Sequence, residues 1–249
     1  MGFLDNHYLL GGASSEAIYN EIKDLPIIDA HNHCDVKALA EDRKFTDIWD
    51  AEGSTDHYVW ECFRKAGVPE EYLTGKKTSN FEKWMAVAAV FDKIAGNPTY
   101  EWIHLDLKRR LGINETISKK NAKDIWEKSK KMLSQKKYSP QSMILSMNVE
   151  AMCSTDDPLD TLEYHKKLAK SRLAGRVRPT FRPDKAMNIA KAGWVDYMAA
   201  LEKRWNTKFN SIDDLMVALK AAHDFFAENG CRASDHGVNV PWSYQYTQK

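Results

Sequence analysis

The stretch "LPIIDAHNHCD", residues Leu25 to Asp35, decides the fold and carries the first candidate site. It is an apolar run that ends in Asp29, His31 and His33. On a β-strand, residues two apart share a face with Cα atoms about 6.6 Å apart, so two imidazoles there can bind one cation such as zinc. The alternative is a pair of solvent-facing loop histidines. The apolar run favours the metal site, because a histidine at a buried strand end needs a polar partner. Asp29 is expected to bond to backbone.

Four short segments are predicted to be buried strands, each with a polar C-terminal end. They are residues 25–33, 148–158, 175–184 and 230–236. Helical patterns follow the strands, as is typical of parallel βαβ units. In a (β/α)8 barrel the catalytic groups lie at the C-terminal ends of the strands, which is where the polar residues fall here. We therefore predict an α/β fold with a (β/α)8, or TIM-like, barrel. A doubly wound sheet is less favoured, because no glycine-rich phosphate loop follows the first strand.

The segment between the first two strands is too long for an ordinary βα loop. It holds several stretches with apolar residues at helical spacing, and we predict a large helical insertion. "GNP" at Gly96 and "SP" at Ser139 mark breaks between its helices, and Asn121 is a predicted helix N-cap. We expect one barrel domain made of three ranges: 1–34 with an N-terminal helix and the first strand, 35–145 with the insertion, and 146–249 with strands two to four.

The composition is that of an ordinary globular protein. The chain has 249 residues, of which 43% are hydrophobic and 29% charged, and its net charge is +1. No clustered excess of Lys and Arg suggests nucleic acid or an anionic membrane as a partner, and no apolar run has the length of a membrane span. The N-terminus lacks the pattern of a signal peptide. Four widely spaced cysteines suit free thiols in a reducing cytoplasm.

The stretch "STDHYVW" offers His57 and Tyr58 as groups for proton transfer. Histidine is the common proton carrier near neutral pH, and tyrosine can act as acid or base where its surroundings change its pKa. The alternative interpretation is a helix N-terminus, capped by Ser54, Thr55 or Asp56, with both aromatic residues exposed. From these residues alone, the helix N-terminus is favoured.

Two further polar strand ends are candidates. Arg182 in "TFRPDK" can grip a carboxylate with two hydrogen bonds, or it can form a structural ion pair with Asp184 or another acid. In "STDDP", Asp156 and Asp157 are expected to cap a helix, because Pro158 follows them.

These stretches together resemble the uronate isomerases (glucuronate isomerases) of the amidohydrolase superfamily. The matching pieces occur in the order of that family and cover nearly the whole chain to about His236. They are "LPIIDAHNH", "DIWDAEGSTDHYVW", "GNPTYEWIHLDLKRRLGI", "STDDP", "FRPDKAMNI" and "GCRASDH".

The resemblance implies a distorted (β/α)8 barrel and an aldose–ketose isomerisation in hexuronate catabolism. The reaction interconverts D-glucuronate with D-fructuronate, and D-galacturonate with D-tagaturonate. It also implies that His31 and His33 are ligands of a divalent metal, usually zinc. His57, Tyr58 and Arg182 match active-site residues of the family. We expect Tyr58 to transfer a proton, His57 to donate a hydrogen bond to substrate oxygen, and Arg182 to bind the uronate carboxylate.

The family is longer than this chain, and its remaining metal ligand, an aspartate, lies on the eighth strand. A catalytic zinc normally has three protein ligands, and open strand edges favour association. We therefore expect either a homo-oligomer or completion by a C-terminal half. Two alternatives remain: a metal-dependent amidohydrolase or lactonase on the same scaffold, and a non-catalytic half-barrel that binds a partner or a sugar acid.

Overall fold

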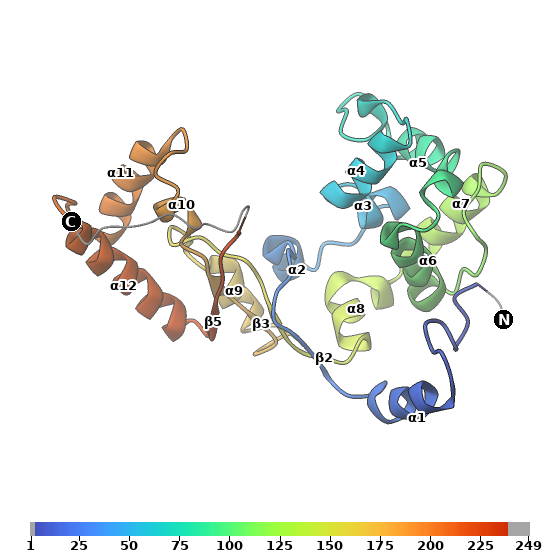
Figure 1. Cartoon of the computed structure of the whole chain (residues 1–249), viewed down its shortest axis with the longest axis horizontal. Coiled ribbons are helices and arrows are strands. Elements are labelled where there is room, and N and C mark those ends of the chain that lie inside the picture. The colour runs from blue at the N-terminus through green and yellow to red at the C-terminus, as the bar shows by residue number, and fades with distance from the viewer. Residues whose placement is uncertain (1–2, 239–249) are drawn as a thin grey trace. The chain divides into compact units, whose positions relative to one another are not determined.

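The structure is a computed structural model, and it describes residues 3–238. The chain divides into two compact units (Figure 1). The helical unit consists of Met1–Leu25 and Asp42–Asn148, and the sheet unit consists of Pro26–Glu41 and Val149–Lys249. The end of the third predicted range, residues 239–249, lies outside the described residues.

The helical unit contains most of the predicted insertion. Its α-helices are α1 (Ala13–Ile22), α3 (Ile48–Glu52), α4 (His57–Lys65), α5 (Asn80–Ala88), α6 (Pro98–Leu111), α7 (Ala122–Leu133) and α8 (Pro140–Ser146). Short 3-10 turns, η1 (Glu70–Tyr72), η2 (Phe91–Ile94) and η3 (Lys136–Tyr138), lie between them. The predicted breaks are confirmed, since α6 and α8 each begin at a proline. Proline suits a first helical position because the N–H it lacks has no partner there.

Local signals explain where these helices begin. Ser79 and Glu82 form a capping box at the start of α5. The Asn97 side chain accepts a hydrogen bond from the Thr99 N–H at 2.9 Å at the start of α6. Asn121 occupies the predicted N-cap position of α7, but its side chain makes no capping hydrogen bond.

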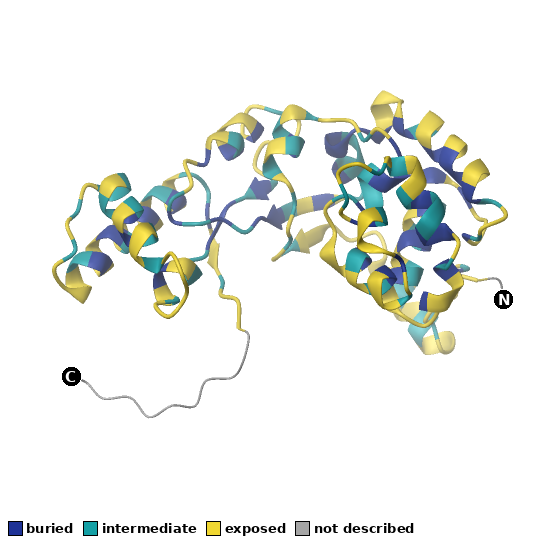
Figure 2. Ribbon diagram, turned by 90° about the horizontal axis from the view of Figure 1, so that it is seen from above, coloured by how far each residue is buried: buried dark blue, intermediate teal, exposed yellow. Residues whose placement is uncertain are grey.

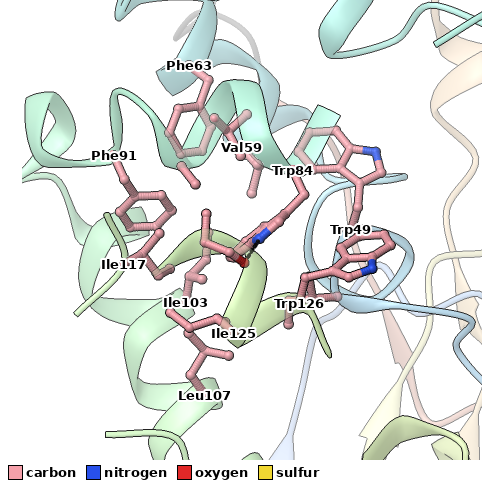
Figure 3. Close-up of a cluster of buried hydrophobic side chains, with 14 of the residues drawn as sticks. Trp49, Val59, Phe63, Trp84, Phe91, Ile103, Leu107, Ile117, Ile125 and Trp126 are labelled. Atoms are coloured by element: carbon pink, nitrogen blue, oxygen red, sulfur yellow. Dashed lines mark hydrogen bonds between the residues drawn. The ribbon is translucent and has the colours of Figure 1, made fainter. Parts of the chain in front are cut away.

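Aromatic and aliphatic side chains together fill the core of the helical unit (Figure 3). Trp84, Phe63 and Phe91 are buried, each with at most 2% of its surface exposed. The Trp84 indole N–H donates to the Ala122 carbonyl at 2.8 Å, so this large side chain is buried without an unpaired polar atom. Leu107 of α6 is also fully buried in this cluster.

Within the described residues, the strands all belong to the sheet unit. They are β1 (Ile27–Asp29), β2 (Val149–Cys153), β3 (Val177–Arg178), β4 (Thr180–Phe181) and β5 (Ala233–Ser234). The helices of this unit are α2 (Val36–Glu41), α9 (Glu163–Leu168), α10 (Asp184–Met187), α11 (Trp194–Trp205) and α12 (Ile212–Glu228). Each of the four predicted strand segments contains a strand. Helices connect β2 to β3 and β4 to β5, as predicted for βαβ units (Figure 1).

All the strand pairs between residues 3 and 238 are parallel. β1 pairs with β2 and β2 with β3, while β4 pairs with β5 in a separate ladder. A bridge between Asp156 and Phe181 continues the pairing of β2 on to β4. β3 and β4 are parts of one predicted strand, interrupted at Pro179, which has no N–H to donate to a ladder. The parallel α/β arrangement is confirmed.

The prediction that all four strands are buried is wrong for two of them (Figure 2). In β1, Ile27 is 47% and Ile28 70% exposed, and both residues of β5 are exposed. Within the described residues, β1 and β5 are the edges of their ladders. A strand is buried only where neighbouring elements cover it, and that covering cannot be read from the strand's own residues. In contrast, β2 and β4 contain buried residues.

None of the helices between residues 3 and 238 is both long and apolar enough to cross a membrane. All four cysteines are free thiols in the structure.

Candidate functional site

The two histidines of the opening stretch converge in the sheet unit. β1 ends at Asp29, so His31 and His33 lie in the irregular segment that follows it, and not on the strand itself. Their Nε2 atoms are nevertheless 3.2 Å apart. The Asp29 carboxylate accepts a hydrogen bond from the His31 backbone N–H at 3.3 Å and from the Asn32 side chain at 3.2 Å. Asp29 therefore has the backbone role that we expected, and it fixes the start of this segment.

The spacing of the histidines fits a bound cation. Two nitrogens held about 2.05 Å from a tetrahedral zinc ion lie about 3.3 Å apart, which matches the distance between the two Nε2 atoms. Both side chains are exposed, so a cation could reach them. Among residues 3–238, no cluster of three or more His, Cys, Asp or Glu side chains has the arrangement of a metal site. The two imidazoles thus fit part of a zinc coordination shell.

Asp235, in the segment just after β5, joins this pair to a third element. Its Oδ2 lies 2.7 Å from His31 Nδ1. Arg182, which follows β4, donates from Nε to Asp235 Oδ1 and from Nη2 to Asp235 Oδ2, both at 2.7 Å. Because β4 pairs with β5, the residues just beyond the two strands meet at the same edge of the sheet. Of the two possibilities for Arg182, the structure therefore shows the ion pair, and Asp235 is its acidic partner.

Charge stabilises this ion pair. The Arg182 guanidinium lowers the pKa of the Asp235 carboxyl, and the hydrogen bond with His31 lowers it further. In return, Asp235 raises the pKa of Arg182. The carboxylate is therefore ionised at neutral pH and can only accept hydrogen bonds.

The prediction that Asp156 and Asp157 cap a helix is wrong. No helix begins at Pro158, and the next one, α9, begins at Glu163. Asp156 is instead buried, and its carboxylate accepts from Ser154 Oγ at 2.7 Å and from the Thr180 N–H at 3.1 Å. Its backbone carbonyl accepts from the Arg182 N–H at 3.0 Å. Asp156 thus holds the backbone on which Arg182 is placed.

Asp157 turns to other partners. It accepts a hydrogen bond from the Tyr197 hydroxyl at 2.9 Å and forms an ion pair with Lys185 at 3.3 Å. Both partners come from helices that follow β4 in sequence. Strong partners from distant elements therefore replaced the capping role expected from the local sequence.

A polar cavity of about 360 Å³ lies beside Arg182 in the sheet unit. Its lining includes three carboxylates, from Asp156, Asp157 and Asp184, and two lysines, Lys185 and Lys191. Such a cavity has the size and polarity for a small polar molecule. Arg182 belongs both to this lining and to the group around His31.

His57 and Tyr58 belong to the other, helical unit, where they begin α4. The Asp56 carboxylate caps this helix by accepting from the Tyr58 N–H at 2.8 Å and from the Val59 N–H at 3.3 Å. Both side chains are exposed, and their ring centroids lie 4.1 Å apart with the ring planes tilted by 34°. The predicted helix N-terminus is confirmed, while the chemical roles of His57 and Tyr58 stay predictions. Tyr58 also lines a cavity of about 500 Å³ within its unit.

Sequence reasoning missed Asp235 as a site residue. The segment "GCRASDH" was recognised only as a polar strand end. The next residue, His236, bonds to Asp184 at 2.8 Å, so Asp184 is not the partner of Arg182. Asp235 directly follows β5, and Arg182 directly follows β4, which pairs with β5. This shared position at the ends of neighbouring strands is the signal that could have identified Asp235.

Comparisons with known proteins agree with each other. A family model described as glucuronate isomerase matches residues 1–249. Uronate isomerase of Thermotoga neapolitana is 47% identical over 239 residues, which cover 96% of this chain and 52% of that protein. Uronate isomerase of Thermotoga maritima is 47% identical over 242 residues, which cover 97% and 53% of the two chains.

Two solved structures have the same fold. The crystal structure of uronate isomerase from Thermotoga maritima matches with a TM-score of 0.93 at 46% identity, covering 100% of this chain and 54% of that one. Glucuronate isomerase from Caulobacter crescentus matches with a TM-score of 0.85 at 23% identity, covering 91% and 49%. At that identity, the second match shows the fold alone. The chain spans about half the length of the curated relatives it matches.

Proposed function

This chain belongs to the glucuronate isomerase family, and we propose from that membership that it serves the isomerisation of hexuronates. The reaction interconverts D-glucuronate with D-fructuronate, and D-galacturonate with D-tagaturonate. One observation carries the proposal: in a chain 47% identical to uronate isomerases, two histidine Nε2 atoms converge to 3.2 Å at the C-terminal end of a parallel strand. Catalytic groups of barrel enzymes come from such strand ends.

The proposed architecture is the first half of a distorted (β/α)8 barrel. The parallel strands follow one another in chain order from β1 through β2 and β3 to the β4–β5 pair, as the first four strands of a barrel would. The exposed isoleucines of β1, and the edge of β5 that has no partner strand within residues 3–238, suit further pairing. We propose that polypeptide equal to the other half of the relatives, or a second copy of the chain, adds to these edges.

The proposed cofactor is a divalent metal, best matched by zinc, held in part by His31 and His33. A metal ion at this point would polarise a carbonyl oxygen and stabilise the negative charge that develops on it. The nitrogens of neutral imidazole are ordinary zinc ligands, and the spacing of the two Nε2 atoms supports the assignment.

The chemistry requires a proton carrier. When the carbonyl moves from C1 to C2, a proton leaves C2 and O1 gains one, which gives an enediol. C1 then gains a proton and O2 loses one, which gives the ketose. We assign the carbon proton transfer to Tyr58 and a hydrogen bond to substrate oxygen to His57. Both assignments rest on the resemblance of "STDHYVW" to the family.

The uronate carboxylate is proposed to bind beside Arg182. The Nε and Nη2 atoms of this arginine are used by Asp235, which leaves Nη1 on its other edge to face an anion. The cavity next to it also has Lys185 and Lys191 in its lining, beside the carboxylates of Asp156, Asp157 and Asp184. We expect the uronate carboxylate to contact the cationic groups of this lining. The free, widely spaced cysteines also support our placing the protein in the cytoplasm.

An assay of uronate turnover tests the proposal. The chain is fused to the second half of the Thermotoga maritima relative, its folding is checked by circular dichroism, and D-glucuronate and D-galacturonate are supplied with zinc. We expect ketose formation, and we expect Tyr58→Phe to lower turnover strongly while the fold is kept. If Tyr58→Phe converted uronates at the wild-type rate, Tyr58 would be excluded as the group that transfers the proton. A folded fusion that hydrolyses lactones but leaves uronates unchanged would favour the hydrolase alternative.

A further inference from the structure

Asp235 has contacts that an ordinary surface carboxylate lacks. Both of its oxygens are held by Arg182, through two parallel hydrogen bonds of 2.7 Å. Bidentate arginine–carboxylate pairs fix the position of both side chains. The side chains of Arg182 and Asp235 are only 23% and 25% exposed, so water screens this pair less than it would an open surface pair. The carboxylate therefore has a defined place beyond the end of β5.

The same carboxylate decides where the protons of His31 lie. An ionised carboxylate only accepts hydrogen bonds, so the 2.7 Å contact with Asp235 Oδ2 requires a proton on His31 Nδ1. A neutral imidazole then has no proton on Nε2. That unprotonated Nε2 faces the Nε2 of His33 at 3.2 Å. Without metal, His33 would donate its Nε2–H to His31 Nε2, which completes a chain of hydrogen bonds from Arg182 to His33.

We propose that Asp235, held in place by Arg182, is the positioning residue that fixes His31 in its Nδ1–H form and so presents the Nε2 lone pair to a divalent cation. The inference rests on the metal role proposed for His31. Metal-binding histidines commonly donate their other ring N–H to a carboxylate, which sets the tautomer and the orientation of the ring. Within residues 3–238, His31 makes such a contact and His33 does not.

This inference gives Arg182 a function that does not require substrate. Arg182 acts through Asp235 on the orientation of His31, in addition to any contact with a uronate. The competing explanation is that the Arg182–Asp235 pair only ties β4 to β5. In that case the tautomer of His31 would not depend on Asp235, because an ion pair between two strands places no demand on the imidazole.

Nuclear magnetic resonance tests the inference directly. The 249-residue chain is labelled with 15N-histidine and kept free of metal at about pH 8, above the pKa of about 6.5 that imidazole ordinarily has. The 15N shifts of protonated and unprotonated ring nitrogens differ, and two-bond correlations to the ring protons assign them. We expect His31 to carry its proton on Nδ1. The matched variants are Asp235→Ala and Asp184→Ala, since Asp184 bonds to His236 Nδ1 in the same unit.

Asp235→Ala is expected to move His31 toward the Nε2–H form, while Asp184→Ala changes His236 and leaves His31 as it was. Zinc affinity, measured by competition with a chromophoric chelator, should fall about 10–100-fold in Asp235→Ala and stay constant in Asp184→Ala. A wild-type His31 with its proton on Nε2 would overturn the inference without any variant, even if Asp235→Ala failed to fold. An unchanged Nδ1–H form in folded Asp235→Ala would overturn it as well.

None of these readouts depends on turnover. A chain that shows the predicted tautomer and zinc affinities but no isomerase activity would keep this inference and count against the proposed function.

Discussion

Mild acid should destabilise the sheet unit through His165, a buried histidine on α9. Its Nε2 lies 2.8 Å from Ser154 Oγ, and this hydroxyl donates to Asp156 Oδ2 at 2.7 Å. The His165 residue is 6% exposed and Ser154 is 1% exposed. Burial lowers the pKa of His165 to about 4, with a small opposing effect from Asp160. The imidazole is therefore neutral in the folded protein and ties α9 to the end of β2.

The sign and size of the effect follow from linkage. In the unfolded chain, His165 takes up a proton near its ordinary value of 6.5, while the folded protein resists protonation until about pH 4. The contribution of neutral His165 to the free energy of unfolding is therefore complete above about pH 6.5, and it is lost as the pH falls toward 4. Each factor of ten between the two proton affinities is worth about 1.4 kcal/mol. The expected loss is about 2 kcal/mol by pH 5 and about 3 kcal/mol in total.

Urea denaturation at several pH values between 7.5 and 4.5, followed by circular dichroism, measures this loss. His165→Gln removes the titrating group, and His223→Gln is the matched control, because His223 is exposed in the same unit. Burial raises the pKa of Asp156, and this separate contribution is present in both variants. We expect the acid-induced drop in the free energy of unfolding to be about 2 kcal/mol smaller in His165→Gln than in the wild type. In His223→Gln the drop should be the same as in the wild type. Equal acid dependence in the wild type and His165→Gln would show that His165 does not carry the effect.

Three further predictions concern the helical unit, and each is checked by urea denaturation. Leu107→Ala should cost about 2–5 kcal/mol, since the side chain is fully buried; a cost below 1 kcal/mol would contradict the core described here. Trp84→Phe should cost about 1–3 kcal/mol, because the Ala122 carbonyl loses its indole donor, and a neutral result would show that this hydrogen bond is dispensable. Asp56→Ala should cost about 1 kcal/mol through loss of the α4 cap, whereas Asp56→Asn, which can still accept, should cost less.

The positions and direction of the strands could be predicted from the sequence, but their burial could not. The apolar bodies and polar ends of residues 25–33 and 148–158 were enough to place β1 and β2. Ile28 is as apolar as any residue of β2, and yet it is 70% exposed. The exposure of its side chain depends on which elements pack against the face of β1, which is a long-range property.

The site shows the same limit. The spacing of His31 and His33 predicted convergence, and their Nε2 atoms do converge even though the segment is not a strand. Asp235, which is 204 residues from His31 in sequence, could not be paired with it from local patterns. Only the alignment of β4 with β5 brings Asp235 to Arg182.

Local capping signals were reliable only where no stronger partner competed. Asp56 caps α4 as expected. Asp156 resembles a cap in sequence, but Ser154 and the Thr180 N–H bind its carboxylate inside the sheet unit. Asn121 lies at the predicted N-cap position, while its side chain bonds to Ser118 in the preceding turn. Side chains that can satisfy tertiary partners leave the role that the local sequence suggests.

The central claim is that this chain supplies metal-binding histidines to uronate isomerisation. The most direct test follows [1-13C]-D-glucuronate by 13C magnetic resonance in the zinc-loaded fusion with the second half of the Thermotoga maritima relative. We expect the anomeric C1 signal to be replaced by the hydroxymethyl C1 signal of D-fructuronate, and a His31→Ala, His33→Ala double variant to abolish this change. A folded, zinc-loaded fusion that leaves the C1 signal unchanged, or a double variant that converts it at the wild-type rate, would contradict the claim.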